Sequence, residues 1–340
     1  MDDIRENRLL SGWAEQLPRR PEQVGNVHET DAELIPLGDG RLLALTIDAV
    51  IEEIAVRLFR DPFTAGRTAV ISSLSDLAAV GAEPIGLLLS VTLPEGNPGV
   101  QGRVAAGVRE ACEEAETFVL GGDTNEGDRL EITVAAAGLV PEREHLTRKG
   151  MRPGDRIFGS GMFGAGSAVA AAALLDAPVS VYAERDYRPP PRVKEGVRLR
   201  GVASACMDTS DGLIATLDQL ARLNGVGIHI DADPMDLLED GARRVSSSLG
   251  LTPPVLLAGH HGEFELVFSV PPDRMESFAA AAAAIDWSPV PIGAAVGGTG
   301  VSLGGLRLDT ARIRNLLPDV GGDLEAYLKG LVSLLSGREP

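Results

Sequence analysis

Several aspartates at the ends of hydrophobic segments are the residues best suited to chemistry in this sequence. Asp48 ends an apolar run in LTIDAV, Asp76 lies in the largely apolar segment SLSDLAAVGAEP, and Asp123 closes VLGGDTN. Carboxylates so close to a core are unfavourable unless they are paired or bound to a cation. Few basic residues lie near them in sequence.

Further aspartates follow the same pattern. Asp208 and Asp211 lie together in MDTSDGL, and Asp31 lies in ETDAEL. Each one alone is explained as a turn or cap residue, with Ser210 or Asp211 capping the next helix. As a set they suit hard divalent cations, because magnesium prefers oxygen ligands and bridges carboxylates to substrate phosphates.

Other common catalytic arrangements are missing from the sequence. The five histidines have no zinc-motif spacing, and neither a Gly-x-Ser-x-Gly elbow nor a GxxxxGK[ST] loop occurs. Phosphoryl transfer fits the remaining residues, since it needs positioning and charge neutralisation more than covalent chemistry. An acceptor that is itself a phosphate is already anionic near neutral pH and requires no general base.

A glycine-rich segment offers an alternative. Gly159–Gly164 matches GxGxxG between an expected strand and an expected helix, with Val179–Tyr182 as a possible next strand and Glu184 at its end. That arrangement is typical of dinucleotide binding and would indicate an NAD-dependent oxidoreductase. It leaves the aspartates unexplained.

The composition narrows the class of protein. The 340 residues carry 31 basic and 49 acidic side chains, a net charge of −18, which argues against nucleic-acid partners. Two cysteines, Cys112 and Cys206, cannot form a disulfide framework. The N-terminus lacks a signal-peptide pattern and no apolar run is long enough for a membrane span, so we expect a cytoplasmic protein.

Alternating strands and helices predict an α/β fold with two domains, 1–150 and 151–340, divided in the turn-rich segment Pro141–Asp155. The elements expected in the first half are strands at Leu42–Ile47, Ile85–Leu93, Phe118–Leu120 and Leu130–Val140, with helices at Thr68–Val80 and Val100–Ala115. Those expected in the second are strands at Arg156–Phe158, Val226–Ile230, Phe264–Val270 and Val290–Val296, with helices at Ser167–Leu175, Gly212–Leu223 and beyond Asp319.

Three strands of the first half are apolar on both faces over most of their length: Leu42–Ile47, Ile85–Leu93 and Leu130–Val140. One sheet layer does not need so much apolar surface. Closing two sheets into a barrel would bury it and remove exposed edges. We therefore expect a homodimer.

Together these motifs resemble the thiamine-monophosphate kinase family. The segments LTIDAV, LSDLAAVGAEP, GGDTN, LTRKGMRPGD, RPPPRV and MDTSDGL occur in that family's order and spacing. The family lies within the aminoimidazole ribonucleotide synthetase (PurM-like) superfamily. The resemblance implies an N-terminal mixed sheet that forms a barrel across a homodimer, a C-terminal α/β domain, and ATP bound with several Mg²⁺ ions.

The resemblance also implies roles for individual residues. The metal-ligand positions are Asp31, Thr46, Asp48, Asp76, Asp123, Asp208 and Asp211. The nucleotide-contacting positions are Gly122, Asp123, Arg148 and Ser210, and the catalytic positions are Asp31, Asp211 and Arg148. The implied reaction converts ATP and thiamine phosphate to ADP and thiamine diphosphate.

The sequence departs from the family where thiamine phosphate is expected to bind. Ala55 replaces a histidine, Gly262 replaces a glutamate, and the C-terminal tryptophan has no match; His260 and His261 are new polar groups. In ETD, Glu29 and Thr30 stand where the family has Gly-Asp. These departures predict weak use of thiamine monophosphate. A relative acting on another small anionic acceptor, and a nucleotide-binding dimer without turnover, are the alternatives.

Overall fold

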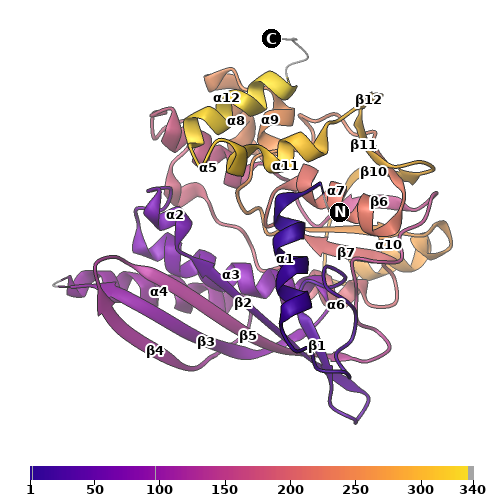
Figure 1. Ribbon diagram of the computed structural model, residues 1–340, viewed down its shortest axis with the longest axis horizontal. Helices are drawn as coiled ribbons and strands as arrows, with labels where there is room; N and C mark the ends of the chain where they lie inside the picture. Colours follow the sequence, from indigo (N-terminus) through magenta and orange to yellow (C-terminus); the bar gives the residue numbers. More distant parts are fainter. Residues whose placement is uncertain (2, 96, 336–340) are drawn as a thin grey trace.

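Two β-sheets with helices packed against them make up the computed structural model, which describes residues 1, 3–95 and 97–335 (Figure 1). The first half of the chain forms a five-stranded sheet and the second half a seven-stranded sheet. Among the described residues, no helix is long and apolar enough to cross a membrane.

The first sheet has the strand order β1-β2-β5-β3-β4. Its strands are β1 (Glu33–Pro36), β2 (Arg41–Val50), β3 (Glu83–Pro94), β4 (Val119–Gly127) and β5 (Glu131–Pro141). Only the β3–β4 pair is parallel; the other pairs are antiparallel. The helices of this half are α1 (Arg5–Gln16), α2 (Glu52–Ala55), α3 (Pro62–Ala79) and α4 (Pro98–Glu114).

Helix α3 covers one face of this sheet and is almost wholly buried. Its start is set by Asp61, whose side chain accepts a hydrogen bond from Phe63 N, and by Pro62 in the first turn. Every second side chain of β2 points toward α3, and among these Leu42 and Ala44 are buried. Helix α3 also contacts α6 and β7 of the second half, so the two sheets share one hydrophobic core.

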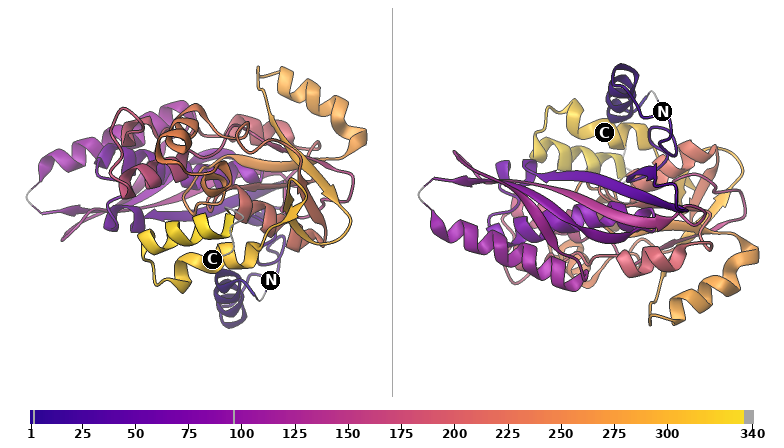
Figure 2. Two further views of the ribbon diagram at one scale, coloured as in Figure 1. Left: turned by 90° about the horizontal axis from the view of Figure 1, so that it is seen from above. Right: turned by 90° about the horizontal axis from the view of Figure 1, so that it is seen from below.

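No helix of the described residues lies over the other face of the first sheet, as the view from below in Figure 2 shows. Residues of the central strands that point this way are apolar and exposed, including Ile47 (68% exposed), Leu45 and Leu88. Leu120 joins them, lying where a side chain on Gly86 would otherwise project. This uncovered surface, which we call the outer face, agrees with the excess apolar character expected from the sequence.

The second sheet has the order β12-β11-β8-β10-β6-β9-β7. Its strands are β6 (Arg156–Gly159), β7 (Ala205–Asp208), β8 (Gly227–Ile230), β9 (Leu266–Val270), β10 (Val290–Val296), β11 (Gly300–Leu303) and β12 (Leu306–Arg307). The helices are α5 (Ala165–Leu174), α6 (Val193–Leu199), α7 (Leu213–Asn224), α8 (Asp240–Leu249), α9 (Pro253–Leu257), α10 (Met275–Ala283), α11 (Thr310–Asp319) and α12 (Leu324–Leu335). Short 3-10 turns occur at Glu184–Asp186 and Pro272–Arg274.

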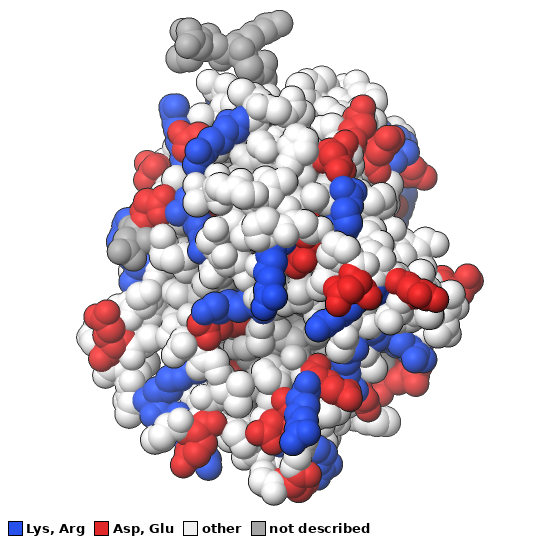
Figure 3. All heavy atoms as spheres, turned by 90° about the vertical axis from the view of Figure 1, so that its right-hand side faces the viewer, with Lys and Arg blue, Asp and Glu red and all other residues white. Residues whose placement is uncertain are grey.

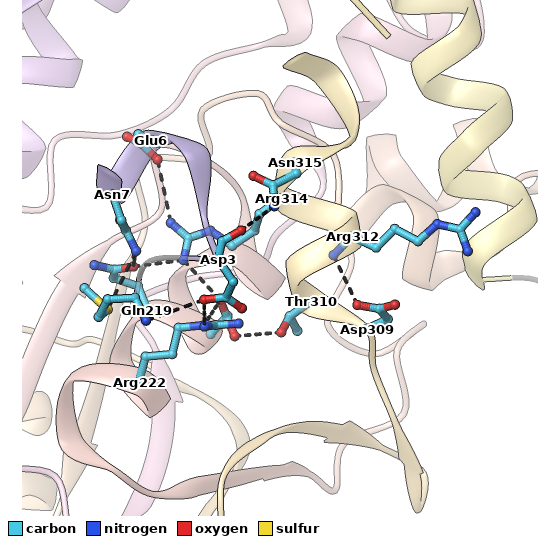
Figure 4. Close-up of polar contacts among 12 residues, drawn as sticks. Asp3, Glu6, Asn7, Gln219, Arg222, Asp309, Thr310, Arg312, Arg314 and Asn315 are labelled. Atoms are coloured by element: carbon cyan, nitrogen blue, oxygen red, sulfur yellow. Dashed lines mark hydrogen bonds and ion pairs between the residues drawn. The ribbon is translucent and has the colours of Figure 1, made fainter. Parts of the chain in front are cut away.

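The N-terminal helix α1 packs on the second half of the chain rather than on its own sheet (Figure 4). Asn7 donates to Gln219 of α7 at 3.1 Å, and Asn315 of α11 accepts from the Arg5 backbone at 2.9 Å. Just before α1, Asp3 pairs with Arg222 at 2.6 Å. These contacts join the two ends of the chain.

Most of the expected strands and helices are confirmed to within a few residues, and four local expectations are wrong. Strand β2 continues past Asp48 to Val50, and GGDTN lies inside β4 rather than in a loop. No strand forms at Val179–Tyr182. Helix α7 has Gly212 (φ 85°) at its N-cap without a side-chain cap, so neither Ser210 nor Asp211 caps it.

Candidate active site

Three of the expected aspartates meet where the two sheets adjoin. Carboxylate oxygens of Asp31, Asp76 and Asp208 lie within 4.8 Å of one another. Asp31 precedes β1, Asp76 comes from α3, and Asp208 ends β7. Three separate segments therefore converge on one point, which we call the aspartate cluster.

Hydroxyl groups hold two of these carboxylates. Thr46 on β2 donates a hydrogen bond to Asp76, and Ser75 donates to Asp208 at 2.6 Å. Asp48 lies beside Asp76 on the same face of β2 as Thr46, because residues two apart on a strand share a face. The structure thus brings together five of the seven expected metal-binding residues.

The cluster is unfavourable without a counter-charge. Burial, followed by the charges of Asp48 and Asp208, raises the pKa of Asp76 well above its ordinary value. Burial and the charge of Asp31 raise the pKa of Asp208 to about 8. Burial also raises the pKa of Asp48. Oxygen-rich groups of this kind suit Mg²⁺, whose charge would offset the repulsion.

Arg148 is the cationic partner of the cluster. Its guanidinium donates to Asp31 at 2.8 Å, and Asp31, Asp208 and Asp76 keep the pKa of Arg148 above its usual value although burial opposes the charge. Asp31 Oδ2 and Arg148 Nε are buried and have no hydrogen-bond partner among the described residues. One free acceptor and one free donor side by side fit a metal ion with a phosphate group bound to it.

A cavity of about 430 Å³ opens beside the cluster, and we call it the acceptor pocket. Asp48, Ser210 and Asp211 line it. Asp211 Oδ1 lies 3.5 Å from His260 Nε2. The charge of Asp211 raises the pKa of Glu6 on α1, so the end of α1 that Figure 4 shows also borders the site. The loop carrying Ser210 is anchored by Thr209, which exchanges hydrogen bonds with the backbone of Glu265.

Asp123 and Gly122 lie apart from the cluster. Asp123 is exposed on edge strand β4, and its carboxylate accepts from Asn125 at 2.8 Å. It pairs in register with Ser90, which pairs with Thr133, and this row points to the outer face, whereas Asp48 points to the inner one. A side chain on Gly122 would collide with the Leu89 carbonyl, so glycine is needed there for strand packing.

The acceptor pocket contains residues that the sequence did not single out. The aromatic rings of Phe59 and Tyr187 stack at 5.6 Å in its wall, and Phe264 joins them. Helix α2 contributes Glu52 and Glu53. Further lining comes from Leu317 and Leu324 near the C-terminus. The only sequence signal for this pocket was the set of unusual residues that do line it: Ala55, Gly262, His260 and His261.

Phe264 explains why glycine stands at 262. A Cβ added to Gly262 would lie 2.3 Å from the Phe264 ring, and the Gly262 carbonyl accepts from Tyr187 at 2.7 Å. The place that a glutamate side chain would need is therefore filled by an aromatic ring. The pocket keeps aromatic and carboxylate groups, which removes the reason for expecting weak use of thiamine monophosphate.

Two carboxylates of the chain, Glu263 and Glu265, occupy the space beside the GxGxxG segment. Glu263 lies at the N-terminus of α5, where Gly166 N donates to it at 3.4 Å, and burial raises its pKa to about 8. Glu265 pairs with Arg192 at 2.7 Å, directly beside Gly161. Strand β6, which precedes the segment, is antiparallel to both neighbours. This is not the parallel sheet with a free helix N-terminus that dinucleotide binding uses.

Known proteins share this architecture. The family described as AIR synthase related protein, N-terminal domain, matches residues 29–140. A solved structure, that of tt0281 from Thermus thermophilus, has a TM-score of 0.78 and 30% identity, covering 91% of this chain and 99% of that one. Hydrogenase maturation protein HypE from Escherichia coli, at 24% identity and a TM-score of 0.66, covers 89% and 96% and shares the fold. The chain is therefore an α/β protein that shares its fold with these structures and contains an AIR synthase related domain at residues 29–140.

Closer relatives specify the family. The thiamine-monophosphate kinase of Salmonella typhimurium is 31% identical over 249 residues, covering 71% of this chain and 75% of the relative. That of Halobacterium salinarum is 33% identical over 238 residues, covering 70% and 80%. The structure of AaThiL complexed with AMPPCP and TMP has a TM-score of 0.70 and 26% identity, covering 82% and 89%. The chain belongs to the thiamine-monophosphate kinase family.

Proposed function

We propose that this protein is an ATP- and Mg²⁺-dependent kinase that transfers the γ-phosphoryl group of ATP to thiamine monophosphate, giving ADP and thiamine diphosphate. The observation that carries the proposal is the buried aspartate cluster with its partner Arg148, next to Asp48, which lines a pocket of about 430 Å³. The complex of a family member with AMPPCP and TMP supports the same pair of substrates.

The residues of the site would bind the metal ion and the phosphate groups during phosphoryl transfer. Asp31, Asp76 and Asp208 would hold Mg²⁺, with Asp48 and Asp211 completing its ligands from the pocket side. When bound, Mg²⁺ neutralises the charge of the transferring phosphoryl group. The free Nε of Arg148 is placed to donate to a phosphate oxygen. No residue needs to remove a proton, since the acceptor phosphate oxygen attacks as an anion.

We assign Ser210, Gly122 and Asp123 to nucleotide binding, with Asp123 also contacting metal. Because Asp123 lies on the outer face, away from its own cluster, this role requires a second copy of the chain to bring an aspartate cluster to it. A homodimer joined through Ile47, Leu88 and the rest of the outer face would do so and would bury exposed apolar surface. We also retain the proposed division into domains 1–150 and 151–340.

The charge of the protein disfavours nucleic acid as a partner. Lys and Arg side chains alternate with Asp and Glu over the face shown in Figure 3 and do not gather into one basic patch. With a net charge of −18, the protein repels phosphate backbones.

The proposal is tested by incubating purified protein with ATP, Mg²⁺ and thiamine monophosphate and separating the products by chromatography. We expect ADP and thiamine diphosphate in equal amounts and no turnover in EDTA. ATP consumption without thiamine diphosphate would assign another acceptor. Magnesium-dependent nucleotide binding with no turnover for any phosphorylated acceptor would indicate a binding protein instead.

A further inference from the structure

Glu53 is a carboxylate that lines the acceptor pocket and does not belong to the aspartate cluster. It lies on the short helix α2 and lines the cavity together with Asp48 and Asp211. Its Oε2 atom is buried and has no hydrogen-bond partner among the described residues. A buried carboxylate oxygen without a partner is destabilising, so such groups usually await a ligand or serve a function.

The surroundings of Glu53 are acidic. The lining residues of the acceptor pocket include Asp48, Glu52, Glu53 and Asp211, and none of them is a lysine or arginine. Burial, and then the charge of Glu52, raises the pKa of Glu53, while His260 acts in the opposite direction. An anionic group placed here would be repelled, and a neutral group would leave the negative charge of the pocket uncompensated. A cation would supply the missing partner.

Aromatic rings complete the environment. Phe59 and Tyr187 stack on one another in the wall of the acceptor pocket, and Phe264 occupies the space beside Gly262. Aromatic faces attract cations, and the attraction grows when water is excluded. A carboxylate and three aromatic residues around one cavity are suited to a flat, positively charged ring.

We propose that Glu53 determines acceptor specificity by pairing with a cationic ring of the acceptor, while the acceptor's phosphate faces the aspartate cluster. This inference rests on the proposed function and deepens it. The acceptor class is then an aromatic cation that carries a phosphate monoester. Glu53 takes over the recognition that the family assigns to the positions occupied here by Ala55 and Gly262.

The test compares two acceptors of one shape. Thiamine monophosphate carries a cationic thiazolium ring, and deazathiamine monophosphate carries a neutral ring in its place. We expect the wild-type protein to prefer the cation, with the preference residing mainly in KM. Glu53→Gln should reduce the ratio of the two kcat/KM values by about 10- to 100-fold, because the thiazolium nitrogen carries no N–H and the lost interaction is the attraction between two opposite charges.

Glu276→Gln is the matched control, because Glu276 is exposed in the first turn of α10, remote from the acceptor pocket. It should leave the ratio unchanged. Equal ratios in wild type and Glu53→Gln would overturn the proposal. So would a fall in kcat alone, equal for both acceptors.

Failure of the proposed function gives a different result. If the wild-type protein makes no thiamine diphosphate, calorimetry with thiamine monophosphate in the presence of AMPPCP and Mg²⁺ still tests Glu53. Binding that weakens at least about tenfold in Glu53→Gln supports the role of Glu53 without the kinase reaction. Binding equal in both proteins, or no binding to the wild type, contradicts it.

Discussion

Replacing Asp208 with asparagine should stabilise the metal-free protein, and the gain should grow with pH. The folded state raises the pKa of Asp208 from 3.8 to about 8, mainly through burial. Between those values the folded protein holds a proton that the unfolded chain releases. The free energy of unfolding of the wild type therefore falls as pH rises through this window.

The change in the free energy of unfolding follows from the raised pKa of Asp208. Each pH unit within the window changes the contribution of one such group by about 1.4 kcal/mol. From pH 5 to pH 8 the advantage of Asp208→Asn over the wild type should increase by up to about 4 kcal/mol. Asparagine still accepts the hydrogen bond from Ser75, so packing changes little.

Urea unfolding in EDTA at several pH values measures this difference, with Asp273→Asn, an exposed residue, as the control. Adding Mg²⁺ and AMPPCP should then stabilise the wild type much more than Asp208→Asn, and kinase activity of the variant should fall about 10²–10³-fold. A stability difference independent of pH would refute the assignment of Asp208 as a buried, repelled carboxylate. Equal stabilisation of both proteins by Mg²⁺ and nucleotide would refute its role as a ligand.

Three further outcomes are expected. Glu263→Gln should raise the free energy of unfolding at pH 8 more than at pH 5, because burial raises the pKa of Glu263 to about 8; a constant difference in chemical unfolding would contradict this. Ile47→Glu should give a monomer in light scattering where the wild type gives a dimer, and an unchanged mass would exclude the outer face as the interface. Arg148→Lys should lower kcat/KM for ATP by at least about tenfold, because lysine lacks the planar fork; wild-type kinetics would show that Arg148 does not contact phosphate.

The sequence predicted Asp76 and Asp208 as members of the aspartate cluster because each ends or interrupts an apolar segment, whereas Asp31 lies in the polar segment ETDAEL. Asp76 stands out on a helix that is otherwise buried, and Asp208 ends the fully buried strand β7, which the sequence did not predict. Such positions are unusual for a carboxylate in any fold. The pattern therefore indicates both of these carboxylates and their need for a cation.

The sequence pattern does not predict on which face of its strand Asp123 lies. Its side chain direction depends on the register of β4 against β3, which is interrupted between Leu87 and Leu88. A shift of one residue exchanges the two faces of a strand. Local sequence does not fix that register, so Asp48 and Asp123 looked equivalent although they lie on opposite faces.

The sequence does not predict the acceptor pocket either. Helix α2 has four residues, too few for a periodic pattern, and Tyr187 comes from a segment without regular structure. Leu317 and Leu324 reach the pocket only through the packing of the C-terminal helices. Glu53 is recognised as a candidate binding residue only because its Oε2 atom is buried and has no hydrogen-bond partner in the described part of the chain. Both are properties of the fold.

The most direct test of the active site is a crystal structure with AMPPCP, thiamine monophosphate and Mn²⁺ in place of Mg²⁺, using the anomalous signal of manganese. Manganese is expected between the carboxylates of Asp31, Asp76 and Asp208, bridging them to nucleotide phosphates. The phosphate of thiamine monophosphate should face the metal and its thiazolium ring should contact Glu53. Manganese and nucleotide bound away from the aspartate cluster would contradict the account.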